Sequence, residues 1–290
     1  MGSKGEKTTV LTGENKMAKK KKSVLSAWDV VKISRHPKRP ILQDYLSLIF
    51  TNFIELHGDR FFSDDLAMIG GFAEIGDQKV MLIGHNKGKK TEENIERNFG
   101  MAKPDGYRKA LRLMKLAERF NIPVVTIIDT PGAFPGLEAE ERGQAEAIAK
   151  NLTEMASLEV PIICVVIGEG GSGGALGIGV GDKILMLSNS IYSVISPEGC
   201  ASILWRDAKF APDAAEALNL TASALYKHGV IDEIIEEPGE GAHTNYEKTA
   251  ASVKSAILRN LEKYKKLSTE ELIQSRFVKY SGMGKFSVNN

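Results

Sequence analysis

Cysteine is scarce in this chain of 290 residues, which contains only Cys164 and Cys200. Both lie among apolar residues, and they lack the paired spacing that a disulfide framework or a cysteine-based zinc site requires. We therefore expect a reducing, cytoplasmic setting and no metal ion bound to this chain.

An excess of charge of either sign is also missing, because 38 basic residues face 37 acidic ones and give a net charge of +1. No overall field then favours nucleic acid or an anionic membrane. No segment approaches the roughly 20 apolar residues of a membrane span. The lysine run at 19–22 is not followed by the apolar segment of a signal peptide. We expect a soluble protein that binds neither membranes nor nucleic acid.

What the sequence does contain is typical of a large globular core, since 42% of its residues are apolar and 26% are charged. This composition excludes a disordered chain. Residues 1–22 are polar and show no helical or strand period, which predicts a flexible leader. We expect one domain over residues 23–267, followed by a C-terminal helical tail over 268–290.

Strand-like and helix-like segments alternate along the domain, which is the habit of an α/β fold. Apolar runs without polar alternation predict four buried strands, at 79–84, 122–129, 160–168 and 183–187. Apolar stripes at helical spacing predict helices over 106–120, 138–158 and 246–267. Ser268 and Glu271 have the spacing of a capping box, which predicts the start of a final short helix.

Two of these strands have the same flanking residues: a proline lies at the start of each strand, and a glycine-rich turn follows its end. The two segments read IPVVTIIDTPGAFPG and VPIICVVIGEGGSGG. Because glycine lets a ligand approach the backbone closely, we expect both turns to face one site.

The second turn, residues 168–174, fits two familiar motifs incompletely. Its glycines match the dinucleotide pattern GxGxxG, but the segment 188–197 lacks the acidic residue that should follow. Residues 170–174 also match the nucleophile elbow GxSxG around Ser172. A hydrolase would then need a downstream histidine, and only His228 and His243 follow, both in peripheral surroundings.

A third interpretation of the turn is an oxyanion hole. Consecutive glycines at the start of a helix present backbone N–H groups with no side chain in front of them, and such groups stabilise an enolate. The purely structural alternative is a tight strand-to-helix turn in which glycine only permits close packing. Five glycines within the seven residues 168–174 exceed what one turn needs, which favours a function.

Several segments together resemble one family, the alpha subunits of bacterial-type acetyl-CoA carboxylase carboxyltransferases. The similarity runs in order from about Trp28 to the C-terminal region. The segments that carry it are RNFGMAKPDGYRKALRLMKLAERF (97–120), IDTPGAFPG (128–136), EERGQAEAIAKNL (140–152), GEGGSGGALGIG (168–179) and SVISPEGCASILW (193–205).

The resemblance implies a crotonase-type (ClpP/crotonase) superhelix of ββα units with an appended C-terminal helical arm. It also implies transfer of the carboxyl group from carboxybiotin, held on biotin carboxyl carrier protein, to acetyl-CoA. The product is malonyl-CoA, in the first committed step of fatty acid biosynthesis. The implied partners are a carboxyltransferase beta subunit in an α2β2 assembly, with zinc expected on that subunit, and a biotin carboxylase that uses ATP.

The same resemblance implies the site residues. Gly173 and Gly174 would supply the oxyanion-hole amides. The substrate-binding residues would be Gly132, Ala133, Gly170, Gly171, Ser196, Pro197, Glu198 and Gly199. The reaction passes through two oxyanions, one on biotin and one on the thioester, so one hole on each subunit would serve both without a protein base.

Two other functions remain possible on the sequence: a self-sufficient crotonase-type acyl-CoA hydratase, hydrolase or decarboxylase, and a non-catalytic scaffold. Nine basic residues between 87 and 115 could attract coenzyme A phosphates, although most are expected on a solvated helix face. Arg142 could either point into the cleft or pair with Glu138 or Glu146 along a helix.

Overall fold

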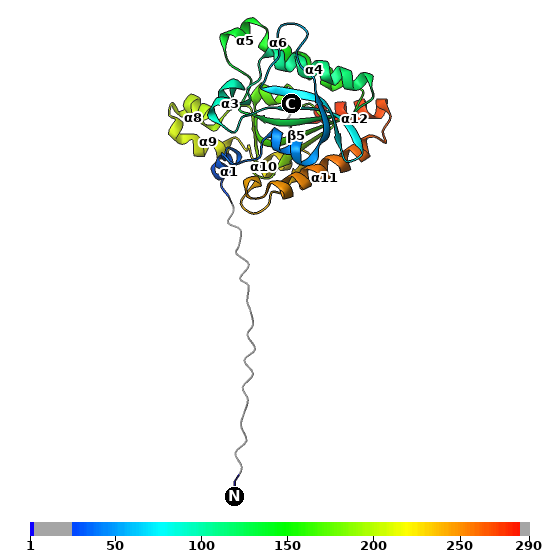
Figure 1. Ribbon diagram of the computed structural model, residues 1–290. Helices are drawn as coiled ribbons and strands as arrows, with labels where there is room; N and C mark the ends of the chain where they lie inside the picture. The colour runs from blue at the N-terminus through cyan, green and yellow to red at the C-terminus, as the bar shows by residue number, and fades with distance from the viewer. Residues whose placement is uncertain (3–24, 285–290) are drawn as a thin grey trace, which may run out of the picture.

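A computed structural model describes residues 1–2 and 25–284 of the chain (Figure 1). Apart from its first two residues, the expected leader over 1–22 lies outside the described residues, as do the last six residues of the expected tail.

A single mixed sheet of eight strands forms the centre of the molecule (Figure 1). Its order is β1-β2-β3-β4-β5-β6-β8, and β7 pairs with the end of β5. The first three strands are antiparallel, whereas the pairs from β3 to β8 are parallel. The strands are β1 (Thr51–Glu55), β2 (Met68–Ile75), β3 (Gln78–His85), β4 (Val124–Thr130), β5 (Ile162–Gly171), β6 (Lys183–Leu187), β7 (Ile191–Ser193) and β8 (Glu233–Ile235).

The four buried strands expected from apolar runs are confirmed as β3, β4, β5 and β6. Every residue of β4 is buried, as a parallel strand covered on both faces should be. β5 continues past the predicted end at 168 to Gly171, because its last residues pair with β7. The sheet thus carries the glycine-rich turn on its own backbone.

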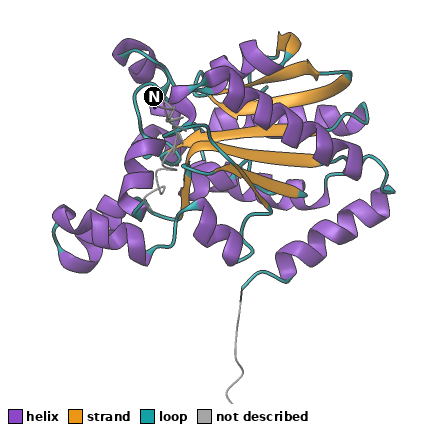
Figure 2. Cartoon of the chain, turned by 90° about the horizontal axis from the view of Figure 1, so that it is seen from below, coloured by secondary structure: helices purple, strands orange, loops and turns teal. Residues whose placement is uncertain are grey.

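Helices cover both faces of the sheet (Figures 1 and 2). α4 and α6 pack on one face, and α2 and α11 pack on the other. The α-helices are α1 (Ala27–Ser34), α2 (Leu42–Ile49), α3 (Thr91–Glu96), α4 (Pro104–Arg119), α5 (Leu137–Glu141), α6 (Gln144–Ser157), α7 (Ser172–Leu176), α8 (Pro197–Trp205), α9 (Ala211–Ala217), α10 (Ala222–Lys227), α11 (Tyr246–Tyr264) and α12 (Thr269–Ser281). Short 3-10 turns are η1 (Asn98–Gly100), η2 (Ala208–Phe210) and η3 (Ala242–Thr244).

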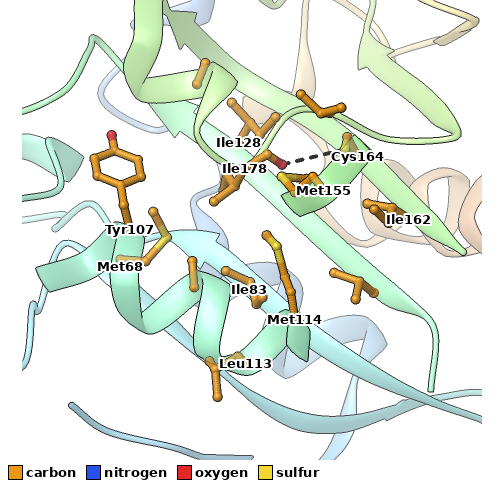
Figure 3. Close-up of a cluster of buried hydrophobic side chains, with 14 of the residues drawn as sticks. Met68, Ile83, Tyr107, Leu113, Met114, Ile128, Met155, Ile162, Cys164 and Ile178 are labelled. Atoms are coloured by element: carbon orange, nitrogen blue, oxygen red, sulfur yellow. Dashed lines mark hydrogen bonds between the residues drawn. The ribbon is translucent and has the colours of Figure 1, made fainter. Parts of the chain in front are cut away.

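The core between the sheet and the pair α4 and α6 is apolar and closely packed (Figure 3). Leu113 and Met114 of α4 and Met155 of α6 are fully buried against Ile83 and Ile162 of the sheet. The apolar stripe predicted for the helix over 106–120 is therefore confirmed as a packing face.

The helix predicted over 138–158 is wrong as a single element, because the chain breaks it into α5 and α6. Gly143 lies between them with φ of 81°, a left-handed conformation that ends one helix and starts the next. The break also removes the regular spacing on which an intrahelical pair of Arg142 depended. Its guanidinium instead lies 3.2 Å from the Asp105 carboxylate of α4.

The final helix begins as predicted, since Ser268 caps α12 in a capping box with Glu271. α12 then returns to the domain, where Arg276 is only 1% exposed. Its guanidinium lies 2.8 Å from the Asp182 carboxylate. It also donates to three backbone carbonyls in the last turn of α6 and just after it, those of Met155, Leu158 and Val160. The buried ion pair fixes the C-terminal helix to the sheet.

Replacing Arg276 with methionine should therefore destabilise the protein strongly. The substitution leaves the Asp182 carboxylate buried without its cation, which costs roughly 3–5 kcal/mol of unfolding free energy. Urea denaturation followed by circular dichroism measures this loss. The exposed pair of Lys209 and Asp207 provides the control, because Lys209→Ala should leave the urea midpoint almost unchanged. Equal effects of the two substitutions would contradict this role of Arg276.

Candidate functional site

The chain reverses direction abruptly at the end of β5. Gly171 is the last residue of the strand, and α7 begins at Ser172, whose φ of 53° is left-handed. A Cβ atom on Gly171 would overlap the carbonyl oxygen of Pro131, and one on Gly174 would overlap the backbone of Gly132. Only glycine at 171 and 174 lets the turn come this close to the segment that follows β4.

The two glycine-rich turns identified in the sequence thus lie in contact. β4 and β5 are parallel neighbours in the sheet, so their carboxyl ends meet at the same edge. The structure places Gly132 and Ala133 directly against Gly171 and Gly174. The expectation that both turns face one place in the molecule is confirmed for their backbones.

The N–H groups of Gly173 and Gly174 lie in the first turn of α7, next to this contact, and have no hydrogen-bond acceptor in the described chain. Within residues 25–284 neither group donates a hydrogen bond to another atom of the protein. Their carbonyls, in contrast, are held inside: the Gly173 carbonyl accepts from the Gly177 N–H at 2.9 Å, and the Gly174 carbonyl accepts from the Tyr107 hydroxyl at 3.2 Å. The first N–H groups of any helix lack an intrahelical acceptor, which explains why these two have no partner in the described chain.

A small cavity opens beside the turn. Its lining includes Gly170, Gly171 and Ser196 from the sequence-predicted set, together with Arg35 and Glu169. Pro197, Glu198 and Gly199 are not among its lining residues. Ser196 caps α8 by accepting a hydrogen bond from the Gly199 N–H at 3.1 Å. Pro197 is buried at the first position of that helix.

Charged side chains that sequence reasoning missed connect the walls of this cavity. The Arg35 guanidinium lies 2.7 Å from the Glu169 carboxylate and 2.6 Å from the Glu198 carboxylate. Behind them, the Lys87 ammonium lies 2.8 Å from Asp129 and 3.4 Å from Glu169. Only Glu198 belonged to the predicted set, and no local pattern announces the others, since Arg35 is 134 residues away from Glu169.

These groups keep each other ionised. Burial raises the pKa of Glu169, but Lys87 and Arg35 outweigh it, so that the pKa lies below its usual range. Burial lowers the pKa of Lys87, but Asp129 and Glu169 reverse the shift, and its pKa is raised. At neutral pH the turn therefore rests on fixed charges of both signs.

Most of the basic residues between 87 and 115 lie within ion-pair distance of acidic side chains. Lys87 is held by Asp129 and Glu169, and Lys109 is buried beside Asp64. Further pairs are Lys103 with Glu138, Arg108 with Asp59 and Asp105, and Lys115 with Glu118 and Glu154. Most of the nine were expected on a solvated helix face, and Lys87 and Lys109 are exceptions because their side chains are largely buried.

The alternatives for the turn gain no support from the geometry. Neither His228 nor His243 forms a hydrogen bond with Ser172 in the described part of the chain, and His243 stacks on His36 with ring centroids 3.9 Å apart. Among residues 25–284, no three histidine, cysteine or acidic side chains gather as metal ligands would. The described helices include none with the length and apolar character needed to cross a bilayer.

Comparison with known proteins decides the family. Residues 4–284 match the family described as acetyl co-enzyme A carboxylase carboxyltransferase-like. This chain belongs to that family. A relative from Hydrogenovibrio crunogenus, named acetyl-coenzyme A carboxylase carboxyl transferase subunit alpha, is 60% identical over 264 residues, which cover 91% of this chain and 83% of the relative. A protein of the same name from Geobacter metallireducens is 55% identical over 284 residues, covering 97% and 89%.

Solved structures confirm the crotonase-type α/β fold that the resemblance implied. Transcarboxylase 12S, solved with methylmalonyl-coenzyme A, superposes with a TM-score of 0.64 at 20% identity, over 82% of this chain and 44% of that one. A Pseudomonas malonate decarboxylase hetero-tetramer in complex with coenzyme A gives a TM-score of 0.60 at 15% identity, over 74% and 85%.

The contact between the turns predicts that alanine destabilises the protein much more at Gly174 than at the neighbouring Gly173. Gly174→Ala should lower the free energy of unfolding by about 1–3 kcal/mol, because the new methyl group must push the Gly132 backbone aside. Gly173→Ala should change it by less than about 1 kcal/mol, because its Cβ would meet only Ile148 at 3.7 Å. Urea unfolding of the two variants tests this, and equal midpoints would refute the close approach.

Proposed function

We propose that the chain is the alpha subunit of an acetyl-CoA carboxylase carboxyltransferase and that Gly173 and Gly174 form its oxyanion hole. The enzyme transfers a carboxyl group from biotin, attached to biotin carboxyl carrier protein, to acetyl-CoA and yields malonyl-CoA. Family membership over most of the chain and the names of the relatives support the reaction. The two N–H groups without an acceptor support the assignment of the site.

The chemistry requires donors more than it requires a base. When bound, biotin supplies the carboxyl group as a readily released carbamate-type adduct. The residues of this chain then have to stabilise negative charge that appears on a carbonyl oxygen at the turn. Backbone N–H groups that are already in place do this well, and removal of one such donor costs roughly 3 kcal/mol of transition-state stabilisation in other enzymes.

The surroundings of the turn suit this role. Gly132 and Ala133 form the facing wall, and Gly170, Gly171 and Ser196 line the adjoining cavity, where a substrate would contact backbone atoms. Glu198 and the remainder of the 196–199 loop are held by Arg35 and by the cap of α8. We assign substrate binding to this set, with Pro197 and Gly199 shaping the loop.

The remainder of the site is assigned to partners. A single oxyanion hole serves only one of the two carbonyl oxygens that become charged, so a carboxyltransferase beta subunit, with zinc of its own, supplies the other in an α2β2 assembly. Biotin carboxyl carrier protein and an ATP-using biotin carboxylase complete the enzyme. The relatives' designation as subunit alpha supports a multisubunit enzyme. We assign this assembly to the cytoplasm.

Valine at position 173 should stop the reaction and leave the fold in place. Its branched side chain would cover the N–H groups, while the position itself has room for a Cβ atom. With a beta subunit, malonyl-CoA and free biotin, kcat of Gly173→Val should fall by about 100-fold or more. Ala251→Val on the exposed face of α11 is the control and should retain full activity.

The same reconstitution separates the competing functions. The wild-type chain should turn over malonyl-CoA only when the beta subunit is present. Turnover by the chain alone would identify a self-sufficient crotonase-type enzyme, and no turnover in the mixture would identify a scaffold. Near-normal kcat in Gly173→Val, with an unchanged circular dichroism spectrum, would remove the two glycines from the mechanism.

A further inference from the structure

The helix that carries Gly173 and Gly174 cannot hold its own geometry. α7 has five residues, and a single helical turn is unstable in isolation. Two of its residues are consecutive glycines, whose backbone angles are the least restricted of any residue type. An oxyanion hole works only when its donors are fixed before the reaction, so other parts of the molecule must fix this turn.

Tyr107 of α4 reaches the turn from the apolar core. Its side chain is 0% exposed and lies at the edge of the cluster drawn in Figure 3, with the hydroxyl pointing away from Met68. That hydroxyl donates to the Gly174 carbonyl at 3.2 Å. The ring passes so close to Gly177 that a Cβ atom there would lie 2.6 Å from it. Glycine at 177 therefore makes room for the tyrosine.

Asn151 of α6 completes the connection between the three helices. It is 1% exposed, and its amide donates to the Gly177 carbonyl at 2.8 Å and to the Tyr107 carbonyl at 3.0 Å. A buried amide or hydroxyl costs free energy unless it is hydrogen-bonded, and an apolar side chain would fill the same space without this cost. The Tyr107 hydroxyl and the Asn151 amide nitrogen therefore donate to the end of α7 and to α4.

We propose that Tyr107 is a positioning residue for the oxyanion hole. Its hydrogen bond fixes the carbonyl of Gly174 and thereby the rotation of the peptide that follows the Gly174 N–H. That carbonyl belongs to the peptide between Gly174 and Ala175, so holding it limits rotation of the Gly174 backbone directly next to the two donors. Burial and, to a smaller extent, Asp65 raise the pKa of Tyr107, so the hydroxyl stays protonated and continues to donate. This inference rests on the proposed function of Gly173 and Gly174.

The test removes one oxygen atom and keeps the ring. In the complex with a beta subunit, with malonyl-CoA and free biotin, Tyr107→Phe should lower kcat roughly tenfold, less than the loss of a donor itself. The KM for malonyl-CoA should stay within about twofold, because the change affects the transition state and not ground-state binding. Because partial unfolding would also lower the apparent kcat at unchanged KM, kcat is calculated per folded enzyme, with the folded fraction measured by circular dichroism under the assay conditions.

Tyr264 provides a matched control. It is 9% exposed on α11, and its hydroxyl also donates to a backbone carbonyl at 3.2 Å, that of Asp182. Tyr264→Phe therefore removes the same kind of hydrogen bond and should lower the urea midpoint to a similar extent as Tyr107→Phe. Its kcat should equal that of the wild type.

A second substitution disturbs the contact between Tyr107 and α7 at Gly177, the residue against which the ring packs. Gly177→Ala should displace the Tyr107 ring and reproduce the loss in kcat. Because both changes break one contact, the double variant should lose less than the product of the two single effects. Multiplicative losses would mean that the two residues act separately, and the proposal would fall.

The outcomes also separate this inference from the function on which it rests. Unchanged kcat in Tyr107→Phe, or equal losses in Tyr107→Phe and Tyr264→Phe, would overturn the positioning role while Gly173→Val remained inactive. A rise in KM alone would also overturn it, because the residue would then act on substrate binding. Activity in Gly173→Val would instead remove the oxyanion hole itself.

Discussion

The structure of the site depends on the contact between two backbones that no side chain separates. Gly171 and Gly174 lie against the segment from Pro131 to Ala133, and a single Cβ atom at either glycine would force them apart. Parallel pairing of β4 with β5 brings the two segments to the same edge of the sheet. Once the turns are this close, their polar groups must either pair with one another or face outward, and the N–H groups of Gly173 and Gly174 remain without an acceptor among the described residues.

Charged side chains next to the two turns hold their backbones in contact. Asp129, at the end of β4, accepts a hydrogen bond from the Glu169 N–H at 3.0 Å and one from the Lys87 ammonium at 2.8 Å. The same carboxylate oxygen thus connects the ends of β4 and β5 to a half-buried cation. Because Arg35 and Lys87 face Glu169 from two sides, the carboxylate is neutralised within the protein, and the backbone amides remain available for charge on a substrate.

Local sequence patterns predicted the elements and the turn, and they failed where distant residues decide the outcome. The runs that became β4 and β5 are mostly apolar and lack polar alternation, so their burial could be predicted. The five glycines of 168–174 indicated a backbone site. Gly143 falls within the helix predicted over 138–158, whereas the structure gives it a left-handed conformation that divides that helix. Tyr107 appeared only as a member of an apolar stripe, because nothing local reveals where its hydroxyl points.

The glycines of the turn have two opposing effects on the site. The absence of a side chain permits the close approach of the turns and exposes the amides, but it also removes the restraint that would keep those amides in one direction. The restraint has to come from residues that lie outside the turn and are rigid themselves. Tyr107 and Asn151 meet this condition, since both stand on long helices packed against the sheet and are buried nearly completely. The apolar core and the polar site are therefore parts of one mechanical arrangement, in which packing of α4 and α6 sets the direction of two hydrogen-bond donors.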